Sequence, residues 1–121
     1  MQTTELQTEL AQFTGTEQYY KPSLFSSMRI TDGVKYFIDQ AGAYWFTDIV
    51  ATEIMPKFKK HDFVVVQLVA LDSKATIIAH DGDNKRILLK KIGYTDCPDG
   101  EYNFFMQDGG GFVVMMLTSE Y

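Results

Sequence analysis

The feature that most constrains the fold is a change of periodicity at Asp62. Beyond it, five segments rich in β-branched and aromatic residues are separated by turn residues. They are FVVVQLVAL (63–71), KATIIAH (74–80), RILLKKI (86–92), YNFFMQ (102–107) and FVVMML (112–117). Most of the connections are too short for a crossover helix, so the pattern predicts strands that run antiparallel as a β-meander.

The residues before this point have helical spacing. Leu6, Leu10 and Phe13 recur at intervals of four and three, which predicts a short amphipathic helix. The segment TDGVKYFIDQAGAYWFTDIVAT (31–52) predicts a longer helical stretch, with Thr31 as its N-cap.

One apolar stripe runs along this second helical stretch. It consists of Val34, Phe37, Ile38, Ala41, Trp45, Ile49 and Thr52, and it leaves out Tyr36, Tyr44 and Phe46. We expect Trp45 and its stripe to hold the helix to the sheet, and the replacement of Trp45 by Ala to cost about 3–5 kcal/mol if the side chain is fully buried. Gly42 indicates a kink or a break between two helices, and Pro56 limits the C-terminal end.

Together these patterns predict a single α+β domain over residues 1–121, with a helical part at about 3–60 and a sheet part at about 62–118. N-terminal helices pack on a four- or five-stranded antiparallel β-meander, and a short strand is also expected at 28–30. Several strands are apolar on both sides, so both sheet faces need cover. Helices cover one face; a curled sheet, the N-terminal loop or a second copy of the chain in a homodimer would cover the other.

The composition favours a cytoplasmic protein without a membrane segment. The longest apolar runs are far shorter than the roughly 20 residues that span a bilayer. The first residues include acids and alternate polar with apolar side chains, unlike a signal peptide. The single cysteine, Cys97, cannot form an internal disulfide, which fits a reducing compartment.

Charge is segregated along the chain, whose formal net charge is −5. Residues 1–53 hold seven acids and three bases, residues 54–91 hold four acids and eight bases, and residues 92–121 hold five acids and no base. The acidic last third argues against general binding to nucleic-acid phosphates. It favours a protein partner with a basic surface.

Three motifs resemble functional sites, but the sequence around each of them favours an ordinary turn. Cys97 lies beside Asp96 and Asp99, which would raise the pKa of its thiol and weaken it as a nucleophile. The segment HDGDN (80–84) lacks the remaining ligands of a calcium loop. The segment DGGGF (108–112) precedes an expected strand, whereas a phosphate loop requires a helix there. We therefore expect no catalytic residue, no metal and no cofactor.

Two clusters of basic residues offer another site. They are Lys57, Lys59 and Lys60, and Lys85, Arg86, Lys90 and Lys91. If they converge on one surface, they would bind nucleic acid or an acidic protein. Basic residues near strand edges more often prevent edge pairing, so direct nucleic-acid binding is not our preferred interpretation.

The acids of the last third, with tyrosines among them, have the aromatic and charged composition of protein interfaces. This composition predicts a partner-binding surface in the sheet part of the chain. The residues that we predict to contact a partner are Asp96, Asp99, Glu101, Tyr102 and Asp108, with Tyr44 as an outlying candidate.

Four segments, FTGTEQYY (13–20), TDGVKYFIDQAGAYWFTDIVAT, YTDCPDGEY and MLTSEY, resemble a family of small uncharacterised proteins of bacteria, phages and plasmids, a domain of unknown function. The resemblance implies a mobile-element context, where small acidic proteins inhibit host defence, anti-CRISPR proteins among them. We predict a non-enzymatic protein-binding inhibitor or adaptor. The alternative is a small-ligand-binding domain or an enzyme, with a pocket between helix and sheet lined by residues such as His61, His80 and Asp48.

Overall fold

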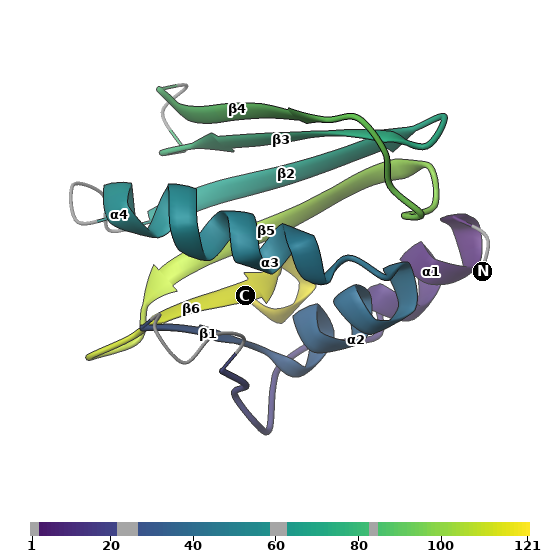
Figure 1. The fold of residues 1–121 in the computed structure, drawn as a ribbon. Coiled ribbons are helices and arrows are strands. Elements are labelled where there is room, and N and C mark those ends of the chain that lie inside the picture. Colours follow the sequence, from purple (N-terminus) through teal and green to yellow (C-terminus); the bar gives the residue numbers. More distant parts are fainter. Residues whose placement is uncertain (1–2, 22–26, 59–62, 83–84) are drawn as a thin grey trace.

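The computed structural model describes residues 3–21, 27–58, 63–82 and 85–121, in which helices lie on one face of a six-stranded sheet (Figure 1). The helices are α1 (Thr3–Leu10), α2 (Asp32–Ala41), α3 (Tyr44–Ile49), a π-helical turn (Val50–Ile54) and α4 (Met55–Phe58), with a 3-10 turn at Thr118–Glu120. The strands are β1 (Met28–Ile30), β2 (Phe63–Leu71), β3 (Lys74–His80), β4 (Arg86–Ile92), β5 (Gly100–Asp108) and β6 (Val113–Leu117). Within the described ranges, every helix is too short or too polar to cross a membrane.

The predicted α+β fold is confirmed, with one or two strands more than the four or five expected. The strands lie in the order β1-β6-β5-β2-β3-β4. β2, β3 and β4 form the predicted antiparallel meander, whereas β5 pairs with the other side of β2. β6 then pairs antiparallel with β5, and β1 adds to β6 in parallel. The meander is therefore interrupted, because the connection between β4 and β5 crosses the end of the β2–β3 hairpin.

The helical stretch predicted over 31–52 is broken at Gly42. Thr31 caps α2 as predicted, since its hydroxyl accepts a hydrogen bond from the Val34 N–H at 3.3 Å. Gly42 ends α2 in the left-handed conformation (φ 62°), which suits glycine because it has no Cβ. The next helix starts out of phase, so Phe46 is fully buried and Trp45 only half-buried. The predicted stripe is confirmed before Gly42, but it does not continue unchanged beyond that residue, where Trp45 packs against the core and is only partly buried.

Pro56 does not end the helical segment, which continues to Phe58. Proline lacks the N–H of a regular helical bond, and its ring collides with the carbonyl four residues earlier. The turn just before it, Val50–Ile54, is a π-helix, in which bonds span five residues: the Met55 N–H donates to the carbonyl of Val50. The wider turn accommodates the proline inside a continuous helical segment.

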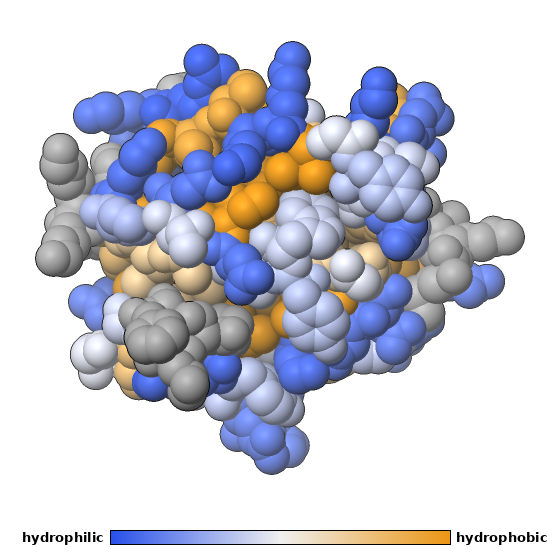
Figure 2. All heavy atoms as spheres, viewed as in Figure 1, coloured by the Kyte–Doolittle hydropathy of each residue, from blue (hydrophilic) through white to orange (hydrophobic). Residues whose placement is uncertain are grey.

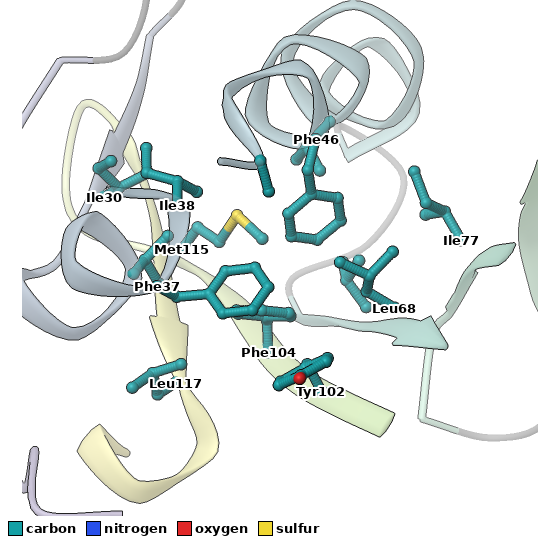
Figure 3. Packing of buried hydrophobic residues seen from close by; sticks show 14 of the residues in the cluster. Ile30, Phe37, Ile38, Phe46, Leu68, Ile77, Tyr102, Phe104, Met115 and Leu117 are labelled. Carbon is teal, nitrogen blue, oxygen red and sulfur yellow. The ribbon is translucent and has the colours of Figure 1, made fainter. Parts of the chain in front are cut away.

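Aromatic side chains hold the helices on the sheet (Figure 3). Phe37 of α2 and Phe46 of α3 point toward Phe104 of β5, with ring centroids 5.3 Å and 5.1 Å from that ring. Tyr102, also on β5, lies 4.9 Å from Phe37. Both helices therefore pack on the same strand, and the core lies between α2, α3 and the centre of the sheet.

The start of α2 is fastened to the last turn of the chain. The Glu120 carboxylate accepts hydrogen bonds from the Thr31 hydroxyl (2.6 Å), the Leu117 N–H (2.9 Å) and the Gly33 N–H (3.2 Å). A Cβ at Gly33 would lie 2.5 Å from Leu117 Cδ1 and 2.6 Å from Glu120 Oε1. Only glycine fits this approach without displacing its neighbours.

The helices do not cover the whole sheet. On the helix side, hydrophobic surface is visible among the charged side chains over β3 and β4 (Figure 2), where Ile87, Leu88 and Ile92 are only partly buried. On β2, buried residues such as Val66 and Leu68 face the helices, whereas the alternate residues, such as Val65 and Gln67, are half-buried on the opposite face. None of the described helices lies on that opposite face (Figure 1).

We expect the replacement of Phe46 by Ala to lower the free energy of unfolding by about 3–5 kcal/mol, because the ring is fully buried among aromatic neighbours. The same change at Trp45 should cost less, because this side chain packs against the core but is only partly buried. Urea denaturation of the two variants measures both values. An equal or larger loss for Trp45 would contradict the packing described here.

Candidate protein-interaction surface

The connection between β4 and β5, residues 93–99, is fixed to the turn of the β2–β3 hairpin, at the right in Figure 1. The Thr95 N–H donates to the carbonyl of Ser73 at 2.8 Å. The Asp99 carboxylate accepts a hydrogen bond from the Asp72 N–H at 3.0 Å. These two bonds hold the connection and the turn together as one surface.

The hairpin turn itself contains two strained residues. Asp72 (φ 53°) and Ser73 (φ 63°) are both left-handed, as in a two-residue turn that ordinarily uses Asn-Gly. A left-handed conformation costs a residue with a Cβ roughly 1–2 kcal/mol. The bonds from Thr95 and Asp99 offset part of this cost, so the connection stabilises the turn that it crosses.

This end of the sheet exposes two large apolar side chains among carboxylates. Leu71 is 62% exposed and Tyr94 is 70% exposed. The Tyr94 hydroxyl donates to the Asp96 carboxylate at 2.8 Å, and this hydrogen bond raises the pKa of Tyr94. We call the surface formed by Leu71, Asp72, Tyr94, Asp96 and Asp99 the acidic end. Glu101, which is also exposed, is the second residue of β5 and lies beside it.

The structure brings only some of the predicted contact residues together. Asp96, Asp99 and Glu101 lie at the acidic end or beside it. Tyr102 is only 3% exposed, and its hydroxyl donates to the carbonyl of Pro98, so it supports the connection from below and cannot contact a partner. Asp108 is the last residue of β5, so almost the whole length of this strand lies between it and Glu101.

The sequence reasoning missed Leu71 and Asp72 as parts of this surface. The predicted strands 63–71 and 74–80 leave only Asp72 and Ser73 between them, which identifies a hairpin tip. Residues at such a tip point into solvent, so the exposure of Leu71 and Asp72 could have been predicted from the sequence. The contact between Asp72 and Asp99 could not, because it exists only where the β4–β5 connection crosses the hairpin turn.

Cys97 is part of the same connection, but its side chain points inward and is 4% exposed. Burial is the main reason that the pKa of the thiol is raised from its ordinary value of 9.0 to about 11; a hydrogen bond with Tyr102 lowers this pKa and the charge of Asp99 raises it, both to a smaller extent. The thiol is therefore protonated at neutral pH and is a poor nucleophile. The predicted effect of neighbouring acids is present, but burial is the larger cause.

A second candidate site is a cavity of about 310 Å³ beside α2 and α3. It is lined by Tyr20, Lys21, Ile30, Lys35, Ile38, Tyr44, Thr47 and Asp48. Tyr44 therefore belongs to this cavity, where its hydroxyl donates to Asp39, which also forms an ion pair with Lys35 at 2.7 Å. Asp48 was predicted to line a pocket and does so; His80 is on a strand of the sheet instead, and His61 lies outside the described residues.

The two basic clusters approach each other where α4 lies near β4. The Lys57 ammonium donates to the carbonyl of Ile87 at 3.2 Å, and Lys90 forms an ion pair with Glu53 at 2.6 Å. Both contacts are made within this chain, so the binding of a phosphate by these two lysines would have to compete with them. Lys59 and Lys60 lie outside the described residues.

The two glycine-containing motifs lie at turns. The segment DGGGF connects β5 to β6 as predicted, with the Gly109 N–H donating to the carbonyl of Phe112 at 2.7 Å. The segment HDGDN follows β3, but its residues 83–84 lie outside the described part of the chain. Among the described residues, no three His, Cys, Asp or Glu side chains are grouped so as to hold a metal ion.

Comparison with known families matches residues 4–121 to a model described as a family of unknown function, DUF6876. The chain belongs to this family. The predicted relationship to an uncharacterised domain is thereby confirmed. A crystal structure of a protein of unknown function from Enterococcus faecalis has a similar fold to this DUF6876 member, with a TM-score of 0.56 and 14% identity over 86% of this chain and 98% of that one. No curated protein matches its sequence.

The pKa of Cys97 predicts a loss of stability at alkaline pH. Below pH 9 the thiol is protonated in both states, and its full contribution is present. As the pH rises toward 11, the unfolded chain releases this proton while the folded chain retains it, so the free energy of unfolding falls. We expect a loss of about 1–2 kcal/mol from this group, after allowing for partial solvent screening.

Denaturation of the wild type and of Cys97→Ala at a series of pH values between about 8 and 11 isolates this contribution, because all other titrating groups are shared. The variant should lose stability less steeply than the wild type. Parallel curves would show that the thiol does not titrate with a raised pKa.

Proposed function

We propose that the protein is a non-enzymatic adaptor or inhibitor that binds a protein partner with its acidic end. The observation that carries the proposal is the exposure of Leu71 and Tyr94 between three carboxylates. Apolar side chains surrounded by charges are typical of interface centres, where the apolar groups supply affinity and the charged rim supplies selectivity. The complementary partner presents an apolar depression bordered by Lys or Arg.

The bracing of this surface supports the same function. Binding costs conformational entropy when a loop must be ordered, and a loop that is already ordered avoids that cost. The connection 93–99 is fixed by Thr95 and Asp99 to the hairpin turn, and Tyr102 supports it from below. The acidic end is therefore prepared for docking before a partner arrives.

The narrower form of the proposal is an inhibitor from a mobile element that acts against host defence, as anti-CRISPR proteins do. Its support is the resemblance described above together with the net charge of −5, which attracts proteins that bind nucleic acid through basic grooves. We place the protein in the cytoplasm, because its one cysteine is a buried free thiol.

We expect Asp96→Lys combined with Asp99→Asn to weaken partner binding about tenfold or more, because the charged rim is removed while the asparagine retains an oxygen for the Asp72 N–H. The matched control is Asp108→Lys with Glu17→Gln, which changes the net charge equally at exposed sites elsewhere. Affinity capture from a bacterial lysate at low and moderate salt identifies the partner, and titration with the purified partner measures both variants.

Retention of wild-type affinity by the first variant would contradict the assignment of the acidic end. Equal weakening of both variants would show that only the net charge matters. A specific loss in the first variant, with stronger dependence on salt in the wild type, supports docking through this surface.

The cavity beside α2 and α3 supports a second candidate, the binding of a small ligand. It combines apolar walls with Lys35, Tyr44 and Asp48, and a few polar groups in an apolar cavity are the usual composition of a ligand site.

A ligand at 100 times its dissociation constant would stabilise the fold by about 2.7 kcal/mol. We expect a metabolite panel to contain a compound that raises the melting temperature of the wild type and not that of Ile38→Trp, which fills the cavity.

A further inference from the structure

The sheet face opposite the helices, here the open face, combines hydrophobic and charged residues. Phe63, Phe105 and Tyr121 form an aromatic cluster on it, with ring centroids 5.0 to 5.6 Å apart. Val65 and Val69 of β2 and Ile78 of β3 are half-buried there, and Leu89 of β4 is 43% exposed. Among the described residues, no helix covers these strands; Tyr121, from the C-terminal segment, packs on Phe63 and Phe105, and the apolar side chains of β2, β3 and β4 beyond it remain partly exposed in a single chain.

The charges on this face have a regular order. The strand register aligns Lys91 on β4, Thr76 on β3, Val69 on β2 and Glu101 on β5 in one row across the sheet. Lys91 and Glu101 thus mark opposite ends of the row, three strand spacings or about 14 Å apart. They are too distant for an ion pair within one chain, and neither has an ion-pair partner among the described residues.

We propose that a second copy of this chain packs on the open face, with Lys91 of each copy paired to Glu101 of the other. A two-fold axis that runs along the strands, between β2 and β3, exchanges β4 of one copy with β5 of the other. Both ends of the row then meet the opposite charge. A surface that is complementary to itself in this way is the signature of a two-fold interface.

The next charged row supports the same axis. Arg86 of β4, His80 of β3, Val65 of β2 and Phe105 of β5 are aligned across the sheet. The axis places the guanidinium of Arg86 over the ring of Phe105 in the second copy, an arrangement favourable for a cation–π contact. Stacked sheets cross at about 30°, which displaces these strands by about one residue and is within the reach of Lys and Arg side chains.

The size of the open face is adequate for a dimer. The axis superimposes the four strands β5, β2, β3 and β4, which are spaced about 4.8 Å apart and about seven residues long, so they give a flat footprint of roughly 440 Å². Because side chains protrude from the sheet, the accessible area is larger than this flat footprint and approaches the roughly 800 Å² per partner of a standard interface.

A nucleic acid would also stack on Phe105, but the acidic end and Glu101 border this face and repel phosphates. The inference does not depend on the proposed function, because it concerns another surface and another partner.

Sedimentation velocity over a concentration series tests the proposal. We expect a dimer for the wild type and a dissociation constant raised at least about tenfold for Lys91→Glu and for Glu101→Lys, because each change places like charges opposite each other twice. An equimolar mixture of the two variants should form a heterodimer, since both pairs are then attractive again. Because Lys and Glu have nearly the same mass, one of the two variants carries an affinity tag, and native mass spectrometry then distinguishes the heterodimer from either homodimer by mass.

Lys21→Glu is the control, because this exposed lysine lines the cavity beside α2 and is not on the open face; it should dimerise as the wild type does. A wild type that stays monomeric at every concentration would overturn the proposal. So would a mixture of Lys91→Glu and Glu101→Lys that remains monomeric. Salt-sensitive binding of single-stranded DNA, lost in Phe105→Ala, by a monomeric wild type would assign the face to nucleic acid instead.

Discussion

The sheet has hydrophobic residues on both faces, but the described helices lie on one face (Figure 1), and the rest of the structure depends on this imbalance. α2 and α3 bury one face through Phe37, Phe46 and Phe104. The π-helical turn before Pro56 keeps the helical segment running along the sheet where a proline would otherwise end it. All of this coverage lies on one side. Apart from the cavity beside α2 and α3, the surfaces available for function are therefore the open face and the ends of the sheet.

The strands could be predicted from the sequence because their information is local. Runs of β-branched and other apolar residues between turn residues located β2, β3 and β4 at 63–71, 74–80 and 86–92, as the structure has them. The N-cap at Thr31 and the break at Gly42 are also local signals, and both are confirmed. The direction of the helical stripe after Gly42 was not predictable, because a break of two residues resets the phase by an amount that only packing decides.

The arrangement of the strands and the composition of the acidic end depend on contacts between distant residues. Nothing in the sequence near Asp99 specifies that its carboxylate will accept the N–H of Asp72. That bond exists because β5 returns to the far side of β2, a choice between topologies that share the same turns. The charge pattern thus indicated which segment carries the acids. It did not indicate that Tyr102 is buried in the core, or that Asp108 lies at the end of β5 away from the acidic end.

The two proposed surfaces are geometrically linked. A two-fold axis along the strands preserves strand direction, so the acidic ends of both copies would lie at the same end of the dimer. Their mutual repulsion would be reduced there, because Lys91 of each copy lies beside Glu101 of the other. Two acidic ends side by side would bind a partner with two basic sites far more tightly than one would, since the second contact becomes intramolecular. The dimer would in this way convert a weak docking surface into a strong one.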